Sequence, residues 1–228
     1  MATTQPLPTN YQYSRPSLKA KMVLYTEQAK FFAANRFDSH MTALIIIDVT
    51  CRKLAKILKT FDHKAVLDAV SKIIERLEVA LRDESVRMDT LLKSLGINEL
   101  AGYSSPVTRE FDITSPEIQR MSSLVQAFDH LIIHVDTAWL HEKFDSSEAD
   151  EFRANKSNQM ARLIRLLVGL GQSARAQAYA SKDAELHEDI DKAEANVSAE
   201  KEEREAARHI EPVGNADPLD SHPEEAVA

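Results

Sequence analysis

The chain has 228 residues, one cysteine and only five glycines, and its 36 acids outnumber its 28 bases to give a net charge of −8. This length suits one domain with a sizeable core, the lone cysteine excludes an internal disulfide framework or a Cys-based zinc finger, and so few glycines disfavour a doubly wound nucleotide fold. The start lacks a secretory signal and no apolar run approaches the ~18 residues of a membrane helix, so we expect a cytoplasmic protein without membrane contact.

The net charge is spread unevenly along the chain. Residues 1–64 carry +6, residues 65–176 carry −4 and residues 177–228 carry −10. A charge asymmetry of this kind prompts a nucleic-acid-binding hypothesis for the basic part. With the hydrophobic pattern, it predicts a flexible arm at 1–17, a basic region at 18–60, a helical extension at 61–176 and an acidic, partly helical to disordered tail at 177–228.

The first predicted element is a strand over residues 18–25, the strongest period-two pattern in the chain. Apolar side chains lie on one face and polar or small ones on the other. The apolar face carries Leu18, Ala20, Met22 and Leu24, and the opposite face carries Lys19, Lys21, Val23 and Tyr25.

The strand is followed by a series of predicted helices. Thr26 caps the first, Asp38 or Ser39 caps a second that ends near Lys59, and a third runs from about Asp62 to the stop at Gly96. A weak second strand at 107–113 precedes a helix that starts at Ser115–Pro116, and Asp145 opens the last core helix. A thin apolar stripe in the tail, which includes Leu186 and Ile190, predicts a helix that frays.

The strand needs a partner, because a single strand cannot satisfy its own backbone groups. The weak strand at 107–113 is one candidate, but a second copy of the chain is the simplest source. A strand that pairs across a dimer, followed by two helices, is the layout of ribbon-helix-helix proteins. We therefore predict a mainly α fold with an N-terminal ribbon-helix-helix, extended by about three further helices.

A two-stranded ribbon fits the major groove of DNA, which suggests roles for particular residues. Lys19, Lys21 and Val23 would contact base edges, since lysine can donate to guanine and a valine methyl can meet a thymine methyl. Phosphate contacts are predicted for residues at the start of the second helix and for nearby basic side chains. These residues are Arg15, Lys30, Arg36, Ser39 and His40. Asp38 would oppose a phosphate there. Alternatively, the two lysines only protect a solvated strand edge.

The run Leu24-Tyr25-Thr26-Glu27-Gln28-Ala29-Lys30-Phe31-Phe32, with Asn35-Arg36-Phe37 after it, resembles the opening of AcaB-like proteins of conjugative plasmids and integrative conjugative elements. The later segments Thr114-Ser115-Pro116, Phe128-Asp129-His130-Leu131 and Trp139-Leu140 are similar too, so the resemblance spans roughly residues 18–176. It implies a transcriptional activator of conjugative transfer genes. Such a protein would bind promoter DNA as a homodimer, contact RNA polymerase and be associated with the nucleoid.

Other functions find less support in the sequence. Walker, GxSxG and HExxH motifs are absent, so we expect neither an enzyme nor a bound cofactor. His130 and His134, with Asp136 and His141 nearby, could hold a metal but lack a matching ligand cluster. The main alternative to DNA binding is a helical scaffold or accessory protein of a conjugative element that binds a protein partner.

Several single residues also receive predictions. Asp48 should pair with the residue four positions on, Arg52. Cys51 should be a small core residue, and Trp139 should lie in the core or at a dimer interface. Arg52, Lys53, Lys56 and Lys59 form a basic patch that is either a solvated helix face or a weak phosphate contact.

Overall fold

The computed structural model describes residues 16–57, 62–181, 183–184 and 186–192, with three single residues beyond them. Within this part the protein is mainly helical, as predicted, with one two-stranded antiparallel sheet. Its elements are β1 (Leu18–Leu24), α1 (Glu27–Asn35), α2 (Phe37–Ile57), α3 (His63–Ser94), β2 (Val107–Ile113), α4 (Pro116–Leu140) and α5 (Ser146–Ala180).

Most element ends follow from local side-chain chemistry. Thr26 caps α1 and Ser115 caps α4, each accepting a hydrogen bond from the backbone N–H three residues on. Asp145 and Glu148 form a reciprocal capping box at the start of α5. Gly96 follows α3 with a φ of +74°, the left-handed conformation that suits glycine after a helix. These predictions from the sequence are confirmed.

The start of α2 differs from the prediction. The helix begins at Phe37, with only Arg36 between it and the end of α1, and it is not capped by Asp38 or Ser39. The Asp38 carboxylate instead accepts a hydrogen bond from Arg109, 2.6 Å away on β2. A side chain engaged by a residue 71 positions away cannot be anticipated from a local capping rule.

The partner of β1 also differs from the simplest expectation. β1 pairs within the chain with β2, in a register that joins Leu18 to Ile113 and Leu24 to Val107. The prediction that β1 pairs across a dimer is therefore wrong for this edge of the strand. The weak second strand was the correct partner, because α1, α2, α3 and their connections bring β2 back alongside β1.

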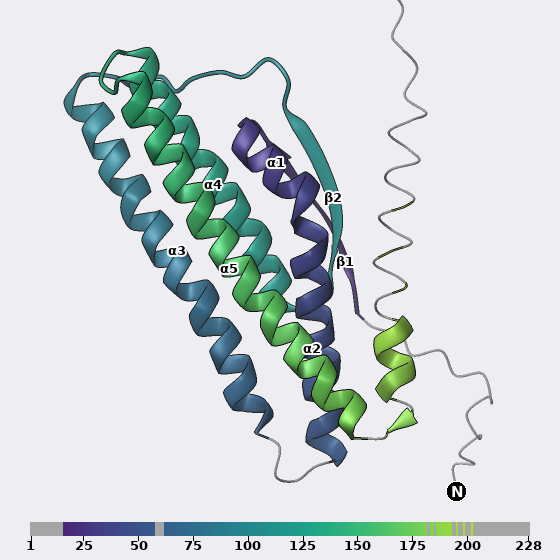
Figure 1. Ribbon diagram of the computed structural model, residues 1–228. Helices are drawn as coiled ribbons and strands as arrows, with labels where there is room; N and C mark the ends of the chain where they lie inside the picture. Colours follow the sequence, from purple (N-terminus) through teal and green to yellow (C-terminus); the bar gives the residue numbers. More distant parts are fainter. Residues whose placement is uncertain are drawn as a thin grey trace, which may run out of the picture.

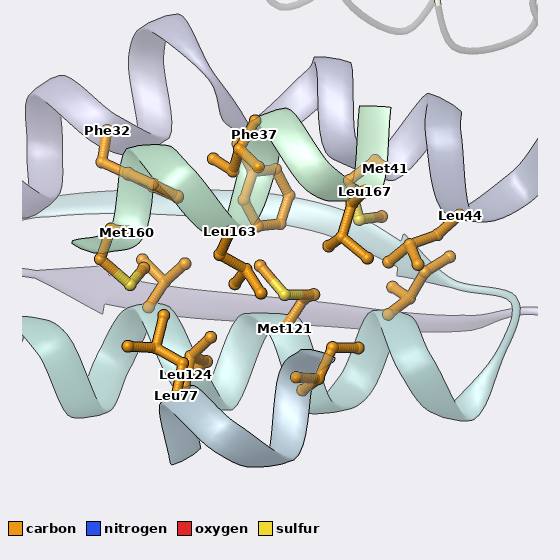
Figure 2. Close-up of a cluster of buried hydrophobic side chains, with 14 of the residues drawn as sticks. Phe32, Phe37, Met41, Leu44, Leu77, Met121, Leu124, Met160, Leu163 and Leu167 are labelled. Carbon is orange, nitrogen blue, oxygen red and sulfur yellow. The ribbon is translucent and has the colours of Figure 1, made fainter. Parts of the chain in front are cut away.

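The strands lie along one side of the molecule and α3 along the opposite side, with α4 and α5 between them (Figure 1). Buried side chains from these helices interdigitate with residues of α1 and α2 in one core, in which Phe37 is 1% exposed and Leu167 fully buried (Figure 2). α2 and α5 approach closely where Gly171 faces Ala43, since a Cβ on this glycine would lie 2.9 Å from the Ala43 Cβ.

The tail needs one further correction, and the outcome for Trp139 is partial. Leu186 and Ile190 are fully buried in the core, so the segment at 186–192 packs against the bundle and is not a fraying helix. Trp139 is 40% exposed, with its Nε1 donating to Ser146 Oγ at 3.2 Å and the Arg153 guanidinium 5.5 Å from its ring, so it lies outside the core, while its place at a dimer interface stays a prediction. Cys51 is buried as predicted, and Asp48 pairs with Arg52 at 2.8 Å.

Candidate nucleic-acid interface

The three residues predicted to contact bases lie together on the exposed face of β1. Lys19, Lys21 and Val23 point away from the core, while Met22 and Leu24 on the opposite face are 1% and 0% exposed. The Lys19 side chain is 90% exposed. The alternation predicted from the sequence is thus confirmed from Ala20 to Leu24, whereas Leu18 at the start of the strand is 69% exposed.

Sequence reasoning missed the acids that share this surface. The register places Asp112 opposite Lys19, Glu110 opposite Lys21 and Thr108 opposite Val23. Lys19 Nζ lies 3.1 Å from Asp112 Oδ2. The six residues Lys19, Lys21, Val23, Thr108, Glu110 and Asp112 form what we call the ribbon outer face. The formal charges of its two lysines and two acids balance within one chain.

A buried arginine holds the ribbon against the first two helices. Arg109 lies on the inner face of β2 and is 6% exposed. Its Nη1 donates to the Ala33 carbonyl at 2.7 Å, and its guanidinium lies 5.0 Å from the Phe37 ring centroid. Arg109 also pairs with Asp38, so the Asp38 carboxylate, which we expected to oppose a phosphate, has a cationic partner.

A second anchor ties the turn between β1 and α1 to α4. Asp129 is 3% exposed and accepts three hydrogen bonds: from the Tyr25 amide at 2.9 Å, the Thr26 amide at 2.8 Å and the Thr26 hydroxyl at 2.7 Å. The carboxylate thus satisfies donors that the start of a helix leaves without partners. This role appears only when the fold brings residue 129 next to residue 26.

The residues predicted to contact phosphates do not form one cluster. Arg15 lies outside the described residues, and Lys30 Nζ is 2.9 Å from Glu27 Oε1. Arg36 and Ser39 do come together, since both line the same surface hollow.

His40 lies in the core and not at the surface. It is 0% exposed and packs between the rings of Phe32 and Phe37. Its Nδ1 donates to the Arg36 carbonyl at 3.0 Å, while its backbone N–H engages the same carbonyl at 3.4 Å. Burial lowers the pKa of His40 from 6.5 to about 4, so the ring is neutral at pH 7. The predicted phosphate contact at His40 therefore has no support in this geometry.

Two adjoining hollows of about 400 Å³ each form a groove between α1, the start of α2, and α5. They share Phe31 and Arg36, and Phe31 is 62% exposed. We call this the α5 groove, and its lining residues are Glu27, Gln28, Phe31, Phe32, Asn35, Arg36, Ser39, Phe128, Ser157, Asn158, Ala161, Ile164, Arg165, Val168, Gly169 and Gln172. Arg165 joins Arg36 there from a distant part of the chain.

The histidines of α4 do not gather a metal-binding set. The His130 and His134 rings lie edge to face at 4.5 Å, and His134 Nδ1 donates to the His130 carbonyl at 2.9 Å. Across the residues that the structure describes, no three His, Cys, Asp or Glu side chains come together as metal ligands would.

None of the helices in the described ranges combines the length and the apolar character that crossing a bilayer requires.

The fold as described is a helical bundle with a two-stranded ribbon on one side. The same fold occurs in the crystal structure of selenomethionine-containing AcaB from uropathogenic E. coli, with a TM-score of 0.70 and 21% sequence identity. The match covers 79% of this chain and 98% of the AcaB chain. The sequence matches no described protein family and no curated protein.

Proposed function

We propose that the chain is a non-enzymatic, sequence-specific DNA-binding regulator of transcription that acts as a homodimer. The observation that carries this proposal is the exposed row of Lys19, Lys21 and Val23 on a strand whose inner face is buried. A ribbon presented in this way has the shape and donors that major-groove recognition needs. The AcaB-like fold and the resemblance in the sequence support the same proposal.

The second edge of β1 supports the proposed dimer. Within the described residues, β1 has β2 on one edge and no strand on the other. An open strand edge is a template for pairing, and two β1 strands related by a two-fold axis would form the centre of a four-stranded sheet. This arrangement would place both copies of Lys19 and Lys21 on one face, with the β2 acids at its margins.

DNA binding is tested by gel shift on promoter regions beside the gene, over a range of salt concentrations. A protein that neutralises Z phosphates loses affinity with a log–log slope of about −0.9Z. The Lys19→Ala/Lys21→Ala variant should lose its preference for the promoter over random DNA by ~10-fold or more, given about 1–3 kcal/mol per base contact.

The matched control is Lys64→Ala/Lys72→Ala, which removes two exposed lysines from α3. It should keep the promoter preference. An unchanged preference in the Lys19→Ala/Lys21→Ala variant would show that the ribbon does not read the sequence. A protein that stays monomeric in light scattering at micromolar concentration would exclude the dimer.

One observation favours the alternative, a scaffold that binds a protein partner. Glu110 and Asp112 balance the lysines of the ribbon outer face, and acids at the edge of a DNA interface repel phosphates. In the scaffold alternative, the mixed charges would pair with those of a partner. The Glu110→Gln/Asp112→Asn variant separates the two proposals, because it should strengthen DNA binding and weaken a charge-matched protein contact.

A further inference from the structure

The α5 groove has an unbalanced positive charge at one end. Arg36 and Arg165 both line the hollow near the start of α2, and none of the residues that line this hollow is acidic. Among the residues that the structure describes, neither arginine has an acidic partner. Most other arginines of the bundle do, for example Arg120 with Glu78 and Arg153 with Asp136.

Apolar surface accompanies this charge. Phe31 is 62% exposed and lines both hollows, and Ile164 and Val168 line the same hollow as the arginines. A groove with an exposed aromatic ring and two arginines suits an extended acidic segment that also carries apolar side chains.

The chain itself contains such a segment. Residues 209–228 carry five acids and no lysine or arginine, together with Ile210, Val213, Leu219 and Val227. The segment preceding it returns to the bundle, because Leu186 and Ile190 are fully buried and Asp191 meets Tyr179 of α5. The acidic segment is thus tethered near the last turns of the helix that forms one wall of the groove.

The tether is long enough. Tyr179 and Arg165 are fourteen residues apart on α5, which corresponds to about 21 Å along the helix. The stretch from residue 193 to 208 could span up to about 50 Å when extended. We propose that the α5 groove binds the acidic C-terminal segment of its own chain, residues 209–228, through Arg36, Arg165 and Phe31.

The test measures distances between two spin labels in the full-length protein without DNA. One label is placed on α5 beside the groove with Ser173→Cys and the other in the tail with Ala226→Cys. Cys51 is buried, and burial raises the pKa of its thiol to about 11. A thiol-reactive spin label added to the folded protein should therefore leave Cys51 unmodified. A bound tail predicts a narrow population of short distances that diminishes as salt is raised.

The Arg36→Glu/Arg165→Glu variant should reduce this population by about fivefold or more, and Arg165→Glu alone should reduce it by a smaller factor. The control is Arg76→Glu/Arg82→Glu, which makes the same charge change on exposed positions of α3 and should leave the distances unchanged. Circular dichroism checks that every variant folds.

Three results would overturn the proposal. The first is a broad distribution that neither charge reversal nor salt alters. The second is an equal loss in the α3 control, which would indicate a general effect of charge. The third is a short-distance population that disappears when labelled chains are diluted with unlabelled ones, because the groove would then hold the tail of a second copy. Since the samples contain no DNA, these outcomes are independent of the DNA-binding test.

Discussion

His40 shows how burial determines the charge of a single side chain. Its ring lies between two phenylalanines, Nδ1 is bonded to the Arg36 carbonyl, and Nε2 has no hydrogen-bond partner in the described part of the protein. Desolvation outweighs the carbonyl bond and the nearby Asp38, both of which favour the charged ring, while Arg109 opposes it. The histidine therefore acts as an aromatic core residue between α1 and α2.

This environment predicts a loss of stability in acid. The unfolded chain takes up a proton near pH 6.5 and the folded chain only near pH 4, so the native state is penalised as the pH falls through this interval. The cost should reach about 3 kcal/mol by pH 4. Urea titrations measure the free energy of unfolding of the parent and of His40→Gln at each pH. Only the parent carries this acid penalty, so the difference between the two free energies should narrow by this amount from pH 7 to pH 4. A stability difference of the same size at pH 7 and pH 4 would contradict the lowered pKa of His40.

Asp129 is a second residue whose role depends on its surroundings, here the hydrogen bonds that its carboxylate accepts. In Asp129→Asn one carboxylate oxygen becomes an NH₂ group, which would face a donor at Tyr25 or Thr26. Leaving a buried donor without an acceptor costs about 1–3 kcal/mol, so we expect the free energy of unfolding to fall by about 2 kcal/mol. Chemical denaturation measures this change. The same substitution at the exposed Asp68 should change it by less than about 0.5 kcal/mol, and equal effects at both sites would contradict the anchoring role.

At the level of elements, the packing of α2 on α5 depends on one glycine. Gly171→Ala would place a methyl group 2.9 Å from the Ala43 Cβ and 3.0 Å from its Cα, so the helices would have to separate. Gly169, about half a turn away, is open, since a methyl group added there would have nothing within 4 Å. Gly169→Ala should stabilise the protein by up to about 1 kcal/mol through helix propensity, whereas Gly171→Ala should destabilise it by about 1–3 kcal/mol. Thermal melts of the pair check the opposite signs.

Helix and strand positions were largely predictable because their signals are local. Thr26, Ser115–Pro116, Asp145 and Gly96 mark element ends through backbone conformation and nearby N–H groups, and the structure uses each of them in this way. Local signals did not settle the start of α2 or choose between the two candidate partners of β1, because Asp38 is engaged by Arg109 and β1 by β2, each more than 70 residues away. The same reason explains why the acids of the ribbon outer face were missed.

At the level of the whole molecule, one continuous core joins the ribbon, helices α1 to α5 and the segment at 186–192. The apolar pattern of the sequence predicted which side chains would be buried, but it did not predict that α5 would lie beside α1 and α2. The α5 groove could not be foreseen for this reason: Arg36 and Arg165 meet only because two segments far apart in the chain pack together. A charge count along the chain indicated a basic region and an acidic tail, without placing either one.

A shared core predicts that the ribbon region and the helical extension unfold together. Trp139 is the only tryptophan, and it reports on the junction of α4 and α5, whereas far-ultraviolet circular dichroism reports on all helices. The two signals should give the same denaturation midpoint, as expected for a single cooperative transition. Asp129→Asn, which loosens the turn between β1 and α1, should lower both midpoints equally. If only the circular dichroism midpoint shifts, residues 18–60 form a unit that unfolds separately from the α4–α5 end of the bundle.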